Sequence, residues 1–211
     1  MTLLDTARRR FAGCGVIALA CGLTLAAGAS SAQTSSKGDA SRGAARAAPC
    51  AACHGTPERT PAAGTPSLSG QQQEFLVLQM FFLREGLRDV PQMAGMLKGV
   101  TDRELTDMAA YFASQRPPGP AAAKPDPKRR GRGAEVANAM GCGSCHMSDY
   151  RGQQHVPRIA NQREDYLVLA LKAYRDNKRS GSDTSMNAVL YQVSDADIQA
   201  LAHYLAHYAA K

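Results

Sequence analysis

The most regular pattern along the chain is a set of four segments in which apolar residues recur at every third or fourth position. Two of them, residues 101–112 and 194–205, start with Thr or Ser and carry an acidic residue three positions later, as capped helix N-termini do. The others, residues 71–86 and 162–178, also gather apolar residues on one helical face. No segment shows the sustained alternation of a strand. The sequence therefore predicts an all-α fold.

The same features occur in two copies, which indicates two tandem domains. A Cys-x-x-Cys-His motif stands at residues 50–54 and again at 142–146, and a proline follows each motif. An aromatic residue, a methionine and a tyrosine then recur at matching spacings in both halves. The matched pairs are Pro66 and Pro157, Phe75 and Tyr166, Met93 and Met186, and Tyr111 and Tyr204.

A proline-rich segment, residues 115–132, separates the two copies. Proline at this density is extended and semi-rigid and does not continue a helix. We therefore predict a first domain at residues 33–114, a linker at 115–132 and a second domain at 133–211.

The net charge of +7 is concentrated outside the two predicted domains. Residues 33–114 and 133–211 each hold eight basic and eight acidic residues, whereas the linker holds six basic residues and one acidic residue. A nucleic-acid-binding protein would present its basic residues on a folded face, so we exclude nucleic acid as a partner. The basic linker suggests the hypothesis of contact with an anionic membrane surface or an acidic partner, and a solvated tether is the alternative.

Residues 1–32 have the three parts of a signal peptide. Arginines at positions 8–10 form a positive start, an apolar stretch covers residues 11–27, and small residues precede a cleavage site before Gln33. The apolar stretch is interrupted by Gly and is short for a membrane span. We therefore expect export to the periplasm, with an uncleaved anchor or a lipid anchor at Cys21 as alternatives.

The duplicated Cys-x-x-Cys-His motif is the attachment signature of c-type haem. Two thiols three residues apart on a helical turn meet the two vinyl groups of one porphyrin, and the adjoining histidine reaches the iron. A four-cysteine zinc site would need both pairs around one ion, but these pairs lie in separate repeats. We predict two covalently attached haem c groups and no structural disulfide. The residues are Cys50, Cys53 and His54 in the first domain, and Cys142, Cys145 and His146 in the second.

The sixth ligand of each iron decides what the protein can do. The first domain has no histidine besides His54, so a bis-histidine iron there would need a ligand from the other domain. Met80 and Met108 lie on apolar helical faces, where core packing explains them. Met93 and Met96 remain, in a loop, and the register of the repeat favours Met93.

In the second domain the candidate ligand is Met186, which lies in a Gly/Ser-rich loop. Met147 directly follows the motif histidine and Met140 precedes the motif, so both start on the wrong side of the porphyrin. His155 is the runner-up, although nine residues after His146 is a short path around the ring.

The remaining paired residues have packing or supporting roles in our interpretation. The backbone carbonyl of Pro66 or Pro157 could accept the Nδ1 proton of the motif histidine and fix its tautomer, with a plain turn as the alternative. Tyr111 and Tyr204 are expected to pack the last helix of each domain against the first, over Gly43 and Gly133. We interpret His203 and His207, one helical turn apart, as surface or packing residues.

These residues resemble the dihaem cytochrome c4 family. The likeness rests on the two Cys-x-x-Cys-His motifs, the Pro-x-Leu/Ile pairs, residues 91–97 and the methionine ahead of Ser194-Asp195, and it covers roughly residues 37–209. It implies that each half has a class I cytochrome c fold, and that the protein is a two-domain body with facing haems that delivers electrons to terminal oxidases in the periplasm.

The resemblance also implies a set of iron ligands, namely His54 with Met93 and His146 with Met186. Two features depart from the family pattern. The linker is unusually basic and proline-rich, and Met147 stands after the second motif where Gly55 follows the first.

The leading interpretation is therefore a periplasmic electron carrier between a quinol-oxidising complex, or another donor, and a terminal oxidase. Thioether ligation raises the reduction potential, and two closed irons leave no position for oxygen. A dedicated cytochrome subunit of a dehydrogenase or reductase is the second interpretation. A dihaem peroxidase or a sulfur-oxidising enzyme would need an open iron or a cysteine ligand, and no cysteine is spare after signal cleavage. We assign no catalytic residue.

Overall fold

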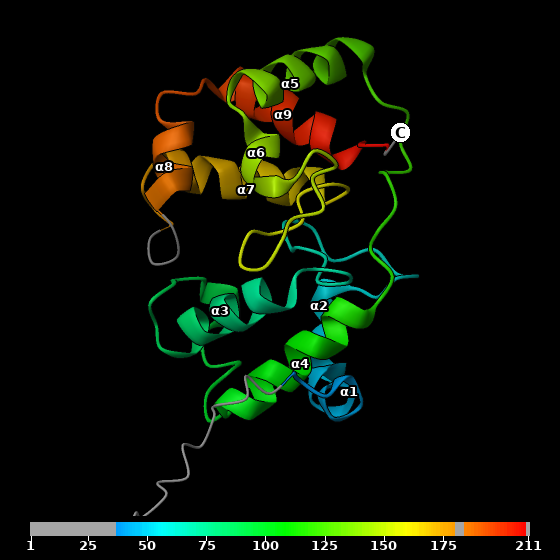
Figure 1. Cartoon of the computed structure of the whole chain (residues 1–211), viewed down its shortest axis with the longest axis vertical. Helices are drawn as coiled ribbons and strands as arrows, with labels where there is room; N and C mark the ends of the chain where they lie inside the picture. Colours follow the sequence, from blue (N-terminus) through cyan, green and yellow to red (C-terminus); the bar gives the residue numbers. More distant parts are fainter. Residues whose placement is uncertain (1–36, 180–183, 210–211) are drawn as a thin grey trace, which may run out of the picture. The chain divides into compact units, whose positions relative to one another are not determined.

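The computed structural model describes residues 37–179 and 184–209, which form helices and no β-strand beyond two isolated bridges (Figure 1). This confirms the predicted all-α fold. The helices, with 3₁₀ turns marked η, are α1 (Ala40–Ala47), η1 (Ala48–Cys50), α2 (Ala51–His54), α3 (Gln73–Arg84), η2 (Pro91–Met93), α4 (Asp102–Ser114), α5 (Pro127–Ala139), α6 (Cys142–His146), α7 (Glu164–Arg175), α8 (Thr184–Leu190) and α9 (Asp195–Ala206).

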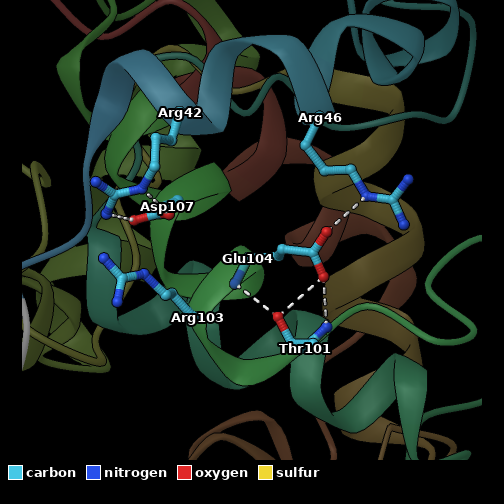
Figure 2. Close-up of a pocket in the computed structure, with 6 residues that line it drawn as sticks. All are labelled: Arg42, Arg46, Thr101, Arg103, Glu104 and Asp107. Atoms are coloured by element: carbon cyan, nitrogen blue, oxygen red, sulfur yellow. Dashed lines mark hydrogen bonds and ion pairs between the residues drawn. The ribbon is translucent and has the colours of Figure 1, made fainter.

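The last helix of each half begins at the predicted cap. At the start of α4, the Thr101 hydroxyl accepts the backbone N–H of Glu104 at 3.2 Å, and the Glu104 carboxylate accepts the backbone N–H of Thr101 at 2.8 Å (Figure 2). Ser194 caps α9 by accepting the backbone N–H of Asp197 at 3.0 Å. These bonds satisfy amide groups that a helix end leaves without partners.

In the first half, α1 and α4 approach closely at Gly43. A Cβ atom on Gly43 would lie 2.0 Å from the carbonyl oxygen of Asp107, so a larger residue could not be accommodated without a shift of the helices. Arg42 of α1 also forms an ion pair with Asp107 of α4 at 2.8 Å, and Figure 2 shows the two side chains facing each other. The hydrogen bond from Arg42 holds the pKa of the Asp107 carboxyl below its usual value.

The second half repeats this crossing with α5 and α9. A Cβ atom on Gly133 would lie 2.1 Å from the carbonyl oxygen of Ala200 and 2.5 Å from the Cβ of Tyr204. The expected contact of Tyr204 with Gly133 is therefore confirmed. Tyr111 packs against the core of the first half and the ring of Phe112, and its expected contact with Gly43 stays a prediction.

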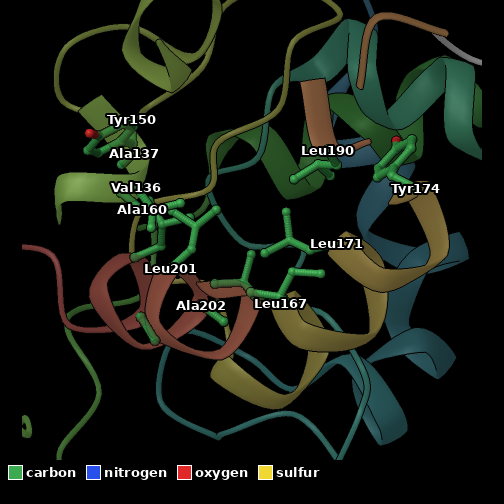
Figure 3. Packing of buried hydrophobic residues seen from close by; sticks show 13 residues of the cluster. Val136, Ala137, Tyr150, Ala160, Leu167, Leu171, Tyr174, Leu190, Leu201 and Ala202 are labelled. Carbon is green, nitrogen blue, oxygen red and sulfur yellow. The ribbon is translucent and has the colours of Figure 1, made fainter. Parts of the chain in front are cut away.

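Each half has its own apolar core. In the second half the buried residues come mainly from α5, α7 and α9, and Figure 3 shows Leu167 and Leu171 of α7 beside Leu201 and Ala202 of α9. Burial of a side chain of this size contributes roughly 1.5–3 kcal/mol. In the first half, α3 and α4 supply most of the core.

The predicted linker is only partly extended. Residues 115–126 contain no helix, but α5 begins at Pro127, so the last six residues of the predicted linker are helical. Asp126 caps this helix by accepting the backbone N–H groups of Lys128 and Arg129, and Pro127 occupies the first turn, where a missing N–H is harmless. Four of the basic residues assigned to a tether therefore lie on α5.

The two halves are joined by a pair of equivalent glutamine contacts. The Gln71 amide donates to the carbonyl of Arg158 at 3.0 Å and accepts its N–H at 2.6 Å. The Gln162 amide donates to the carbonyl of Ser67 at 2.9 Å and accepts its N–H at 2.8 Å. The two glutamines are separated by 91 residues, and so are their partners Ser67 and Arg158, so the contact is reciprocal. The described residues of both halves belong to one compact unit.

Among the described helices, none is both long and apolar enough to cross a lipid bilayer. The predicted signal peptide, residues 1–32, lies outside the described residues.

Candidate haem-binding sites

Each Cys-x-x-Cys-His motif forms a short helical turn. In the first half η1 ends at Cys50 and α2 continues to His54, and in the second half α6 starts at Cys142 and ends at His146. Residues three apart on such a turn lie on neighbouring parts of one face. Cys50 and Cys142 are partly buried, and Cys53 and Cys145 are exposed.

The motif histidines are held by the prolines as predicted. Nδ1 of His54 lies 2.9 Å from the carbonyl oxygen of Pro66, and Nδ1 of His146 lies 2.8 Å from that of Pro157. A carbonyl only accepts, so Nδ1 carries the proton and Nε2 keeps its lone pair for a metal. Burial lowers the pKa of both imidazoles, partly offset by the carbonyl contact, which favours the neutral, ligating form.

The two partly buried cysteines do not have the character of reactive redox thiols. Burial raises the pKa of the Cys50 and Cys142 thiols, whereas a reactive cysteine needs a lowered pKa. Two thiols and a histidine with a fixed tautomer in each half are the donor set that covalent haem requires. Haem bound there would supply reversible one-electron chemistry, held by the two thiols and the histidine of each motif.

The structure separates the two candidate methionines of the first half by exposure. Met93 ends η2 and is half-buried, whereas the Met96 side chain is 59% exposed. A ligand to a buried iron has to point inward, so this difference favours Met93.

In the second half Met186 lies on helix α8 rather than in the predicted loop. It is half-buried and packs against the same apolar core as Cys142. The Gly and Ser residues that suggested a loop precede this helix in the sequence, at residues 180–182. The runner-up ligand, His155, is exposed.

His203 and His207 are buried packing residues of α9 and its end. Together with Glu164 they lie close enough to hold an ion, but hydrogen bonds already occupy both nitrogens of His203. Its Nε2 accepts the backbone N–H of Asp126 at 2.9 Å, and its Nδ1 faces the Glu164 carboxylate at 2.8 Å. We therefore assign these residues to the anchoring of α5 and α7 on α9.

Met147 occupies a backbone position that suits glycine. Its φ is 69° and its ψ is 156°, and Gly55, which follows the first motif, has a φ of 72°. Left-handed φ with extended ψ costs a residue with a side chain on the order of 1–3 kcal/mol.

Replacement of Met147 by Gly is therefore expected to stabilise the haem-loaded protein by about 1 kcal/mol, since the added freedom of glycine in the unfolded chain offsets part of the strain. Thermal unfolding of the variant checks this. The reciprocal change, Gly55→Ala, should be destabilising, because its Cβ would lie 2.2 Å from the carbonyl oxygen of Arg59. A less stable Met147→Gly variant would contradict the assignment of strain.

Comparison with known proteins agrees with this geometry. The cytochrome c family model matches residues 131–209. Cytochrome c4 of Pseudomonas aeruginosa is 34% identical over 177 residues, which cover 80% of this chain and 88% of the relative. The chain belongs to the cytochrome c4 family. A crystal structure of reduced recombinant cytochrome c4 from Pseudomonas stutzeri superposes with a TM-score of 0.72 at 31% identity, covering 82% of this chain and 100% of that one.

Membership of the cytochrome c4 family establishes the general character of the protein. It is an all-α c-type cytochrome of two tandem domains, it carries two covalently attached haems for which the two motifs are suited, and it is an electron carrier and not an enzyme. A further relative is the thiosulfate dehydrogenase electron acceptor of Thiomonas intermedia, 31% identical, with 76% of this chain and 78% of the relative covered.

The sequence alone did not identify the residues that form contacts between the two halves. Gln71 and Gln162 are separated by 91 residues, as are Arg88 and Arg179. This is also the spacing of the paired prolines Pro66 and Pro157. When the comparison of the two repeats is extended to polar positions, the spacing matches these residues in pairs. The spacing does not show that they are in contact in the folded protein.

Proposed function

We propose that both haem irons have histidine and methionine ligands, His54 with Met93 and His146 with Met186. The observation that supports this most strongly is the duplicated bond from a motif histidine to a proline carbonyl, which leaves Nε2 unprotonated in each half. The half-buried positions of both methionines agree with it.

With these ligands, protein side chains would leave no coordination position of the iron open, and the geometry of the site would change little when the iron is oxidised or reduced. The proline carbonyls orient the imidazoles, and the thioether sulfurs stabilise ferrous iron and so raise the reduction potential. Burial disfavours the additional positive charge of the ferric state. The residues therefore favour electron transfer over ligand binding.

We propose the periplasm as the location, with residues 1–32 as the signal peptide. The first domain in this proposal is residues 33–114, and the second begins with α5 at Pro127 rather than at residue 133. The donor in this proposal is a quinol-oxidising complex or another dehydrogenase, and the acceptor is a terminal oxidase. The relative named as a thiosulfate dehydrogenase electron acceptor favours a second candidate, in which the donor is a thiosulfate dehydrogenase.

Contact with an anionic membrane surface or an acidic partner remains a hypothesis for the basic segment. On α5, Arg129 and Arg132 already form ion pairs with Glu164 and Asp197. Lys128 and Arg130 are exposed, and neither forms an ion pair with a described residue, so they are the residues on α5 that could serve such contacts.

Electron transfer from the reduced, haem-loaded protein to isolated oxidase-containing membranes tests the proposed acceptor, and reduction of the oxidised protein by thiosulfate dehydrogenase tests the second donor. We expect rapid oxidation by the membranes, and slower oxidation at higher ionic strength if the basic segment steers association. Neutralising Lys128 and Arg130 should then remove part of this salt dependence. Failure of the membranes to oxidise the protein would contradict the proposed acceptor.

A further inference from the structure

Three tyrosine rings pack against one another in the second half, and we call them the tyrosine cluster. Tyr150 follows the second motif, Tyr204 lies on α9, and Tyr208 comes four residues later. The ring centroid of Tyr150 is 5.9 Å from that of Tyr204 and 4.9 Å from that of Tyr208. The centroids of Tyr204 and Tyr208 are 5.8 Å apart. All three pairs meet edge to face, which is a favourable geometry for aromatic rings.

The inner end of the tyrosine cluster reaches the second haem-binding site. Tyr150 is only 5% exposed, and it belongs to the apolar core against which Cys142 packs. Burial and the hydroxyl of Tyr204 raise the pKa of Tyr150, and the Cys142 thiol adds to this effect, so the phenol is neutral. Tyr150 therefore connects the attachment cysteine of the second haem with the two outer rings.

The outer end of the tyrosine cluster lines a surface cavity of about 700 Å³. Tyr204 and Tyr208 share this lining with Arg130 of α5 and with Ser148 and Asp149, which follow the second motif. The hydroxyl of Tyr208 donates to the backbone carbonyl of Ser148 at 3.3 Å and so holds the ring at the cavity wall. The volume is within the range of binding pockets in proteins.

The unbalanced charge of this cavity is positive. Arg130 is exposed and forms no ion pair with a described residue. Asp149, the acidic residue of the lining, is paired with Arg151 at 3.1 Å. The group that complements the free guanidinium is a carboxylate, which can bind it through two parallel hydrogen bonds.

The first half has no equivalent of the tyrosine cluster. Its counterpart of Tyr204 is Tyr111, but the residue four positions later is Gln115. The segment that follows the first motif, residues 55–65, contains no aromatic residue. A feature that only one of two repeated domains carries indicates a role that the domains do not share.

We propose that the tyrosine cluster is the route by which the second haem exchanges electrons with a redox protein that docks a carboxylate on Arg130 in the cavity. The proposal rests on the proposed function as a carrier between redox proteins, whichever donor and acceptor these are. One electron passes between the second haem iron and the redox centre of the partner. The tyrosines stay neutral phenols, and no bond forms or breaks.

The rings matter because electronic coupling decays less steeply along bonded and closely packed atoms than through water. The three edge-to-face contacts give a continuous packed path from the side of Cys142 to the cavity. A phenylalanine at position 208 keeps this path, whereas a leucine shortens the side chain and removes the ring contact.

The test uses the full-length, haem-loaded protein in its oxidised form, with a reduced plant-type [2Fe–2S] ferredoxin as the electron donor. This ferredoxin is an acidic protein and is strongly reducing. Stopped-flow absorption at low ionic strength measures the rate of haem reduction. Tyr208→Leu is compared with Tyr208→Phe, and Tyr111→Leu is the matched control in the first half.

Tyr208→Leu is expected to slow the reduction about tenfold, which is about 1.4 kcal/mol in the activation free energy. Tyr208→Phe should keep most of the rate, and Tyr111→Leu should leave it unchanged. Both haem potentials should stay the same in all three variants. Reduction by dithionite, a small reagent that does not need the cavity, should also stay the same.

Arg130→Gln tests the docking of a carboxylate, and Lys128→Gln is its matched control on the same helix. Both residues are exposed and both changes remove one positive charge, but Arg130 lines the cavity and Lys128 does not. General attraction of an acidic partner would weaken equally in the two variants. A docked carboxylate predicts a rate about threefold lower in Arg130→Gln than in Lys128→Gln, as for an exposed ion pair.

Four results would overturn the proposal. Equal rates for Tyr208→Leu and Tyr208→Phe would show that the path of rings is not used. Equal rates for Arg130→Gln and Lys128→Gln, which are surface changes that do not disturb the core, would show that no carboxylate docks in the cavity. A loss in Tyr111→Leu as large as that in Tyr208→Leu would place electron entry in the first half. A dimer in sedimentation equilibrium that Tyr208→Leu abolishes would assign the cavity to a second copy of the chain.

Failure of this proposal is distinguishable from failure of the proposed function. If oxidase-containing membranes do not oxidise the unmodified protein, the proposed acceptor is wrong, and the ferredoxin reaction still tests the route. If the route is wrong, the membranes still oxidise the protein, and Tyr208→Leu accepts electrons from ferredoxin as fast as the unmodified protein does.

Discussion

Replacing Met186 by Ala in the haem-loaded protein is expected to open one of the two irons, and Met93→Ala is expected to open the other. Loss of the thioether leaves the fifth position with the motif histidine and the sixth without a protein ligand. Each variant should therefore bind carbon monoxide at one haem of two in the reduced state. The potential of that haem should also fall, because the ligand that favours ferrous iron is gone.

Met96→Ala is the matched control for the first domain. Met96 lies three residues from Met93 but is 59% exposed, so its removal should leave both irons closed. Absorption spectroscopy with and without carbon monoxide measures all three variants. Carbon monoxide binding by Met96→Ala, together with none by Met93→Ala, would assign the ligand to the other methionine.

Replacing Gly133 by Val is expected to destabilise the protein by about 3 kcal/mol or more, because overpacking at a helix crossing forces backbone shifts. A Cβ there would lie 2.1 Å from a backbone oxygen of α9 and 2.5 Å from the Cβ of Tyr204, and neither atom is the free end of a side chain. Thermal unfolding of the haem-loaded variant, followed by circular dichroism, measures the effect.

Gly131 provides the control on the same helix. A Cβ on Gly131 would meet no atom within 4 Å, so Gly131→Ala should stabilise the protein by about 0.5–1 kcal/mol through helix propensity alone. If Gly133→Val and Gly131→Ala changed the stability of the protein in the same way, the close approach of α5 and α9 would not be what requires a glycine at position 133.

Local signals in the sequence predicted much of the fold and of the haem-binding sites. Thr101 and Ser194 could be identified as caps because a cap depends on residues three positions apart. The bond from each motif histidine to a proline carbonyl could be expected because the repeat presents the same pair twice.

The start of α5 could not be predicted from the sequence because many prolines precede it. Pro127 at the first turn and Asp126 before it are a valid helix start, but four more prolines in residues 115–126 favoured a continuous linker. Helix α8 was missed for a similar reason, because the Gly and Ser residues before it dominate the local composition. Propensity is weak evidence where tertiary packing decides the outcome.

The contacts between the halves depend on tertiary arrangement and could not be derived from spacing. Gln71 and Gln162 look like ordinary surface residues in the sequence, yet each pairs with backbone atoms about 90 residues away. Arg88 and Arg179 likewise have ordinary neighbours in sequence, and both donate to Gln79 in the folded protein.

The most direct test of the central claim is carbon monoxide binding to the reduced, haem-loaded mature protein, followed by absorption spectroscopy. If both irons are ligated by histidine and methionine, the spectrum should not change. A change equivalent to one haem would show that one iron is open or weakly ligated, and it would contradict an electron carrier with two closed irons.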